Sequence, residues 1–386
     1  MFNEAIDTKT NQKIQIFFQR NNDTLLSPWE ISHFINQFSS NYYKNELLLS
    51  ISKALNSNIP PENIFILDDS FNINLSYSKL DIIDLNNTKG VKQLYHLGKP
   101  VSLYPNQRIF FINLIFYFFR TLNEIIYRIV HTRISKDCLE KYITPSKDAD
   151  LKKIISELKD LSYLFLQKRG VKDKNEDIEN AFKFTMSRII NFEREQIDVE
   201  ILRKNLDNND YSSLEQDKYK RLESKYFTSF FREFNNNSRP VVGIYYPEIH
   251  QMQILCVNHI NKTKRDSRFL DLKQFSHNSP YMVEIMVGIS IAVPLMKEIK
   301  YHFDEYRLKK RKEELDGETA YLNLKLEEIY KKLENITTDK SLTAIENVEN
   351  DYIKTKIEGT KNSNDKKINE PIKKYDFFLT DIIVKE

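Results

Sequence analysis

The stretch from Lys13 to Asn56, KIQIFFQRNNDTLLSPWEISHFINQFSSNYYKNELLLSISKALN, contains both kinds of regular secondary structure. Residues 13–19 are rich in β-forming side chains in weak alternation, which predicts a strand, and the following Asn-Asn-Asp supplies a turn. Ser27-Pro28-Trp29-Glu30 is a capping box with proline at the first helical position. Apolar residues then recur at helical spacing up to Pro60, so we expect a strand and a long helix in a protein of the α+β class.

Outward from this stretch, the hydrophobic periodicity changes along the chain. Apolar stripes at helical spacing fill residues 106–236, and period-two patterns then predict strands over residues 241–246, 251–260 and 268–275. We therefore expect an N-terminal small α+β unit, a central helical bundle, a second small antiparallel sheet with a helix, a protruding C-terminal helix with coiled-coil character, and a linker with a terminal strand. The expected bounds of these five parts are 1–105, 106–238, 239–296, 297–335 and 336–386.

The charges nearly balance, because 58 Lys and Arg stand against 55 Asp and Glu and leave a formal net charge of +3. No field from the whole molecule would draw it to nucleic acid or an anionic bilayer, so any such binding must be local. Cys138 and Cys256 form neither a disulfide framework nor a zinc site, and the acidic N-terminus does not read as a secretion signal. We expect a cytoplasmic protein, and the bias towards Lys, Asn and Ile indicates a bacterial or phage source.

Two segments are apolar enough to raise the question of a membrane, residues 109–119 (IFFINLIFYFF) and residues 281–296 (YMVEIMVGISIAVPLM). Neither reaches the roughly 20 residues that a spanning helix needs, and Glu284 and Pro294 interrupt the second. We expect both segments to be buried core helices, and membrane is not an expected partner. A membrane-acting effector that inserts residues 281–296 remains a third hypothesis for the function.

Glu248, which follows a proline, and the triplet Asp271-Leu272-Lys273 form the most specific catalytic candidate. If adjacent strands brought the two carboxylates together, they could hold Mg²⁺ while Lys273 positioned an attacking water. The pattern resembles that of the PD-(D/E)xK nucleases, although Glu stands where Asp is usual at the first position, and it would imply a Mg-dependent nuclease. A basic turn between the two motifs would then face the phosphate backbone of a nucleic acid. Its residues are Lys262, Lys264, Arg265 and Arg268. The competing interpretation is an ordinary solvated strand face.

The C-terminal region carries two features that are typical of contacts between chains. They are a heptad-like stripe of Leu315, Leu322, Leu326, Ile329 and Leu333, and a terminal strand with Phe377 and Phe378. The terminal strand could return onto a sheet of its own chain or add to a sheet of a neighbouring subunit. No serine nucleophile elbow, Walker loop, dinucleotide fingerprint or metal-ligand spacing occurs in the sequence, so we expect no metal and no cofactor outside the nuclease alternative. The leading hypothesis is a non-enzymatic component of a protein assembly, as a homo-oligomer or a complex subunit. A bacterial defence (antiphage), toxin or mobile-element system would suit such a protein.

Overall fold

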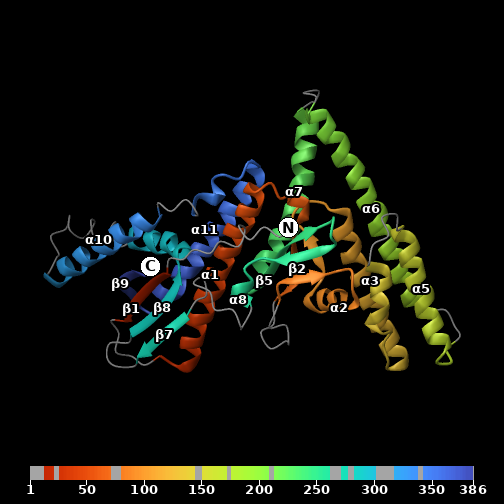
Figure 1. Ribbon diagram of the computed structural model, residues 1–386, viewed down its shortest axis with the longest axis horizontal. Helices are drawn as coiled ribbons and strands as arrows, with labels where there is room; N and C mark the ends of the chain where they lie inside the picture. The colour runs from red at the N-terminus through yellow and green to blue at the C-terminus, as the bar shows by residue number, and fades with distance from the viewer. Residues whose placement is uncertain are drawn as a thin grey trace. The chain divides into compact units, whose positions relative to one another are not determined.

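The computed structural model describes residues 13–20, 26–70, 80–143, 150–171, 175–207, 213–260, 271–276, 282–300, 317–337 and 342–385 (Figure 1). It is a mixed helix and sheet structure with two antiparallel sheets, which confirms the α+β class. The chain divides into two compact units. Unit 1 comprises residues 1–59, 72–80 and 255–386, and unit 2 comprises residues 60–71 and 81–254.

The sheet of unit 1 joins the two ends of the chain. Its strand order is β7-β8-β1-β9, with β1 at Lys13–Arg20, β7 at Asp271–Ser276, β8 at Met282–Gly288 and β9 at Phe377–Lys385. All neighbours are antiparallel, and Ile16 of β1 faces Ile285 of β8 and Ile382 of β9. The predicted strands at both ends of the chain are confirmed, and the terminal strand returns onto a sheet of its own chain.

Helix α1 (Pro28–Asn56) covers the core face of this sheet, and its capping box of Ser27 and Glu30 is present as predicted. Phe34 and Phe38 of α1 pack on Phe18 of β1 with ring centroids 6.3 and 6.1 Å apart. Helix α10 (Gly317–Thr337), helix α11 (Asp351–Lys374), the helical residues 292–300 and the short turn η4 (Leu342–Ile345) complete the core of unit 1.

The structure corrects three expectations for residues 251–296. Strand β6 (Gln251–Ile254) stops early and is followed by the short helix α8 (Val257–Ile260). Residues 281–296 are not one core helix, because β8 precedes the turn η3 (Ile289–Ile291) and the helical residues 292–300. The alternation of buried Val283, Ile285 and Val287 is that of a half-buried strand, whose β-branched residues suit a pleated surface. The strands expected to form one sheet belong to two.

Residues 336–370 were expected to be a linker on composition, and this expectation is wrong. Most of them belong to α10, η4 and α11, and Asn350 caps α11 by accepting from the Ile353 amide. The buried face of α11 includes polar side chains, which is why apolar periodicity did not reveal the helix. Its buried polar residues are Thr360, Asn364, Asp365 and Asn369.

Unit 2 is built on a sheet of order β3-β6-β5-β2-β4. Its other strands are β2 (Ile64–Ser70), β3 (Ile82–Asp84), β4 (Pro100–Ser102) and β5 (Pro240–Tyr246). Five consecutive residues of β5, Val241 to Tyr245, are buried, so both faces of the central strand are covered. The turn η1 (Pro61–Asn63) leads into β2, and α2 (Thr88–Leu97) packs on β3.

The remaining helices of unit 2 form the helical region that the sequence predicts. Helices α3, α5 and α6 contact one another, and α7 contacts α6. They are α3 (Gln107–Val130), α5 (Leu151–Gln167), α6 (Glu176–Asp207) and α7 (Ser213–Asn236), with η2 (Lys136–Cys138) and α4 (Leu139–Ile143) between α3 and α5. In Figure 1, α6 and α7 are splayed and converge at the ends that lie away from the sheet of unit 2.

Helix α3 contains the apolar residues 109–119, and the prediction of a buried core helix is confirmed for this segment. Among the described helices, α3 alone is long and apolar enough to cross a bilayer by length and composition, and 61% of its most apolar window is buried inside the protein. Such burial is typical of a core helix.

Candidate functional site

The structure places the residues of the nuclease hypothesis in two different units. Glu248 lies exposed in the turn after β5, which pairs with β2 and β6 in unit 2. Asp271 and Lys273 lie on β7, which pairs with β8 in unit 1. The expectation that adjacent strands carry Glu248 and Asp271 is therefore wrong. The predicted basic turn lies outside the described residues. It consists of Lys262, Lys264, Arg265 and Arg268. Among described residues, no three His, Cys, Asp or Glu side chains are grouped to hold a metal ion.

The structure also corrects the interpretation of the heptad-like stripe as an exposed seam. Ile329 and Leu333 of α10 are buried in the core of unit 1, and Leu326 packs against that core. Leu315 and the side chain of Leu322 lie outside the described part of the chain. In β9, Phe377 is buried against Phe34 with ring centroids 4.7 Å apart, and Phe378 is half-buried. The buried members of both sets are occupied by contacts within their own chain.

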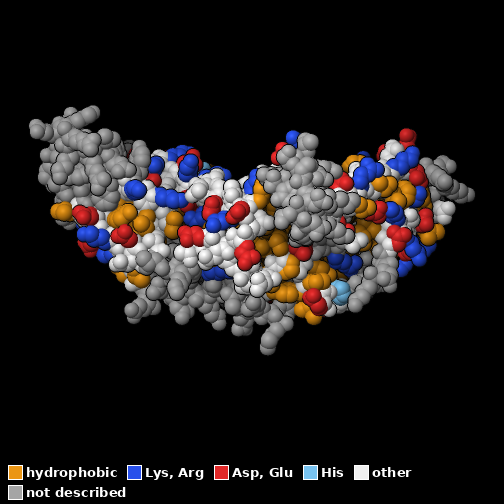
Figure 2. Space-filling view, turned by 90° about the horizontal axis from the view of Figure 1, so that it is seen from above, with side chains coloured by type: hydrophobic (Ala, Val, Ile, Leu, Met, Phe, Trp, Pro, Cys, Tyr) orange, Lys and Arg blue, Asp and Glu red, His pale blue; other side chains and the backbone are white. Residues whose placement is uncertain are grey.

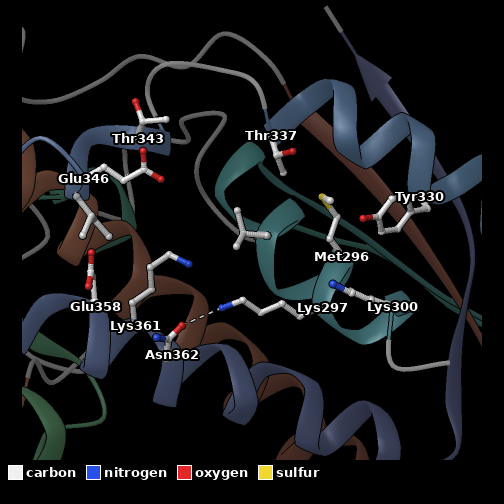
Figure 3. Close-up of a pocket in the computed structure, with 12 residues that line it drawn as sticks. Met296, Lys297, Lys300, Tyr330, Thr337, Thr343, Glu346, Glu358, Lys361 and Asn362 are labelled. Carbon is white, nitrogen blue, oxygen red and sulfur yellow. Dashed lines mark hydrogen bonds between the residues drawn. The ribbon is translucent and has the colours of Figure 1, made fainter. Parts of the chain in front are cut away.

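Unit 1 contains a pocket of about 570 Å³ between residues 292–300, α10, η4 and α11 (Figure 3). This volume lies within the range of small-molecule sites, roughly 300 to 1,000 Å³. The lining combines apolar side chains with charged ones and three hydroxyl groups. Its residues are Val293, Met296, Lys297, Lys300, Tyr330, Thr337, Thr343, Ile345, Glu346, Glu358, Lys361 and Asn362.

Three lysines form the basic wall of the pocket. Lys297 and Lys300 lie one helical turn apart, and Lys361 projects from α11. Figure 3 shows the amino groups of Lys297 and Lys361 pointing into the space between their helices, where Lys297 Nζ donates to Asn362 Oδ1 at 2.9 Å. Lys300 is exposed at the rim and forms no ion pair with another residue in the described ranges.

A single buried carboxylate, that of Asp365 on α11, holds this wall in place. It accepts from Lys297 Nζ at 2.7 Å and from Lys361 Nζ at 3.0 Å, and Asn45 of α1 donates to its other oxygen at 2.8 Å. Burial lowers the pKa of Lys361 from its ordinary value, while the attraction of Asp365 opposes that shift. Two ammonium groups therefore share one carboxylate, which leaves this wall with net positive charge.

Two glutamates line the pocket beyond Lys361, on the side away from Lys300 (Figure 3). Glu346 follows η4 and Glu358 lies on α11, and neither carboxylate forms an ion pair with a described residue. The Thr343 side chain lies near Glu346, whereas Thr337 lies towards Met296 on the other side (Figure 3). The pocket is therefore bipolar, with Lys297 and Lys300 towards one end, the two glutamates towards the other and Lys361 between them.

Behind the pocket, α1 and α11 meet through buried polar side chains. Asn364 is fully buried, and neither polar atom of its side chain has a hydrogen-bond partner within the described structure. Burial lowers the pKa of Lys44 on α1 to about 8, and the neighbouring charge of Lys367 adds to that effect. Unsatisfied buried polar groups each cost about 1–3 kcal/mol, so this interface gives α11 less stability than an apolar one would.

No protein-family model matches this chain, and no curated protein or solved structure is significantly similar to it.

Sequence reasoning missed the pocket, because its walls come from segments far apart in the chain. Lys297 and Lys361 are separated by 64 positions and meet at Asp365 only after α11 has packed on α1. One signal was available, since Lys297 and Lys300 share a helical face at a spacing of three. Without the partner helix, such a pair is indistinguishable from a solvated helix surface.

Proposed function

We propose that unit 1 binds a small polar ligand that carries an acidic group at one end and hydroxyl or amine groups at the other. The observation that carries this function is the bipolar pocket of about 570 Å³, with Lys297 and Lys300 towards one end, Glu346 and Glu358 towards the other and Lys361 between them. A phosphate or carboxylate would pair with the lysines. Hydroxyl or amine donors of the ligand would reach the two glutamates.

Three further observations support a ligand at this place. The charges of Lys300, Glu346 and Glu358 have no ionic partners within the described structure, so a ligand would gain contacts without breaking existing ones. Lys297 and Lys361 are already oriented by Asp365, which reduces the entropy lost on binding. The apolar side chains of Val293, Met296 and Ile345 supply the surface that small-molecule sites usually bury.

We expect a nucleoside monophosphate, which combines a phosphate with ribose hydroxyls, to raise the thermal midpoint of the full chain more than either inorganic phosphate or the bare nucleoside. The measurement is a thermal shift titration followed by calorimetry, since a ligand that binds the native state stabilises it by mass action. The Lys300→Glu substitution reverses the charge at the rim and should weaken binding about tenfold, a loss of about 1.4 kcal/mol.

The matched control is Lys366→Glu, on the exposed face of α11 and outside the pocket. This variant makes the same change in net charge and should bind as the unaltered chain does. Equal weakening by both variants, or no stabilisation by the nucleotide, would contradict the proposal.

Assembly of the chain with other proteins is the second candidate function, and one observation on α6 favours it. Ile190 and Ile197 lie one heptad apart on this helix, and their side chains are 46% and 58% exposed. Both point away from the side that buries Thr185 and Ile189. Figure 2 shows hydrophobic side chains among charged ones at the right, where α5 and α6 lie. An exposed apolar stripe on a helix is typical of a contact surface.

If this stripe joins two copies of the chain, the protein should sediment as a dimer, and the double substitution Ile190→Glu and Ile197→Glu should convert it to a monomer. The two introduced carboxylates would be buried in the interface without partners, which raises the free energy of the dimer. Analytical ultracentrifugation checks the result. A monomer at every concentration before substitution would refute self-assembly through α6.

A further inference from the structure

A cluster of cationic side chains surrounds two tyrosines in unit 2, on α2, α3 and the segment that leads into η2. Its members are Lys92, Tyr95, His96, Arg120, Tyr127, Arg133 and Lys136. None of them belongs to the pocket of unit 1. The cluster gathers four permanent cations in a chain whose overall charge is close to neutral.

Tyr95 is the centre of the cluster. The guanidinium of Arg120 lies 5.0 Å from its ring centroid, and the ammonium of Lys136 lies 5.4 Å from it. Arg120 also donates to the Tyr95 carbonyl at 2.5 Å, and Lys136 Nζ lies 3.2 Å from His96 Nε2. Cation–π contacts of this kind hold the charged groups in position.

The cations are poorly balanced by acidic groups. Lys92 pairs with Asp137, but Arg120, Arg133 and Lys136 form no ion pair with any residue in the described part of the chain. Burial lowers the pKa of Lys136, and the positive charges of Arg133, Arg120 and Lys92 lower it further. Neighbouring cations therefore repel one another, and an anion placed among them would relieve that repulsion.

An exposed aromatic ring borders this cationic surface. Tyr127 on α3 is 46% exposed, and the guanidinium of Arg133 lies 4.8 Å from its ring centroid. Proteins that bind single-stranded nucleic acids combine cationic grooves along the backbone with aromatic rings on which bases stack. Fixed cations beside an accessible aromatic ring match that combination.

We propose that this cluster binds the phosphate backbone of a single-stranded nucleic acid, with Arg120, Arg133 and Lys136 contacting phosphates and Tyr127 stacking against a base. The binding is confined to this cluster. Its affinity falls as the salt concentration rises, because the cationic side chains release the counterions that surround the contacted phosphates. It is independent of the ligand pocket in unit 1. A membrane surface would fit less well, since Tyr127 alone offers an exposed ring for insertion among the cluster residues.

The test is fluorescence anisotropy of the full chain with a labelled single-stranded oligonucleotide of about 16 nucleotides, at several salt concentrations. The unaltered chain should bind it, and the affinity should fall as salt rises. The double substitution Arg133→Glu and Lys136→Glu should weaken binding at least about tenfold and flatten the salt dependence. Tyr127→Ala should weaken binding by about tenfold and leave the salt dependence unchanged, because stacking carries no charge.

The matched control is Lys168→Glu with Lys183→Glu, two exposed lysines of unit 2 outside the cluster, which change the net charge by the same amount. This control should bind as the unaltered chain does. If the double substitution in the cluster prevents folding, Arg133→Gln, at an exposed position, replaces it with the same expectation of weaker binding. Three results would overturn the proposal: no binding to the oligonucleotide, equal loss in the control, or binding only to vesicles that contain phosphatidylserine.

Discussion

Substituting Asp365→Asn should lower the free energy of unfolding of unit 1 by about 3–5 kcal/mol. The Asp365 carboxylate is 2% exposed and holds the ammonium groups of Lys361 and Lys297. Asparagine keeps the shape and a hydrogen bond to Asn45, but it leaves the Lys361 ammonium, whose side chain is 15% exposed, without its counter-charge. Lys297 is 49% exposed, so water screens its share of the loss.

Hydrogen exchange of the peptides that cover α1 and α11, at increasing urea concentration, measures this effect, because both helices belong to unit 1. The matched control is Asp381→Asn in β9, whose ion pair with Lys332 is 3.4 Å long and half exposed. That substitution should cost less than about 1 kcal/mol. A loss of similar size in both variants would show that burial does not govern the strength of the Asp365 pairs.

Substituting Gly90→Ala should destabilise unit 2 by about 3 kcal/mol or more. Gly90 lies in the first turn of α2, and a β-carbon there would overlap the backbone carbonyl oxygen of Asp84 at the end of β3. Backbone atoms on both sides must move to remove the overlap, since no flexible side chain can give way. Hydrogen exchange of the peptides that cover α2 and β3 measures the loss of protection.

The same substitution at Gly359 provides the control, with an effect of opposite sign. Gly359 lies inside α11, and no atom approaches within 4 Å of the position of an added β-carbon. Gly359→Ala should therefore stabilise the helix by roughly 0.5–1 kcal/mol through the lower backbone entropy of alanine. A stabilising Gly90→Ala substitution would contradict the close packing of α2 on β3.

Local signals in the sequence predicted the elements that depend on neighbouring residues. The Ser27 and Glu30 capping box set the start of α1, and the apolar run at 109–119 is buried in α3, because capping and helical periodicity act over a few residues. The terminal strand was predicted from its β-forming residues, and both possible destinations were left open. Its pairing with β1 was not visible, since the partner lies at the other end of the chain.

The errors have a common physical cause. In α11 the buried face includes Asn364 and Asp365, and in α1 it includes Asn41 and Asn45, so polarity in the sequence did not indicate exposure. Their burial depends on hydrogen bonds such as the one between Asn45 and Asp365, across 320 positions. The basic wall of the pocket depends on the same long-range pairing. Composition alone could therefore suggest only a linker where the structure has helices that line a pocket.

The order in which the strands of unit 1 occur along the chain has a consequence for synthesis on the ribosome. Strand β1 emerges first, but its neighbours β8 and β9 are translated only after the whole of unit 2. At roughly 5–20 residues per second, β1 waits on the order of tens of seconds for its partners. During that interval Ile14, Ile16 and Phe18 of β1 have no sheet partner, so a chaperone that covers this strand should protect the nascent chain from aggregation.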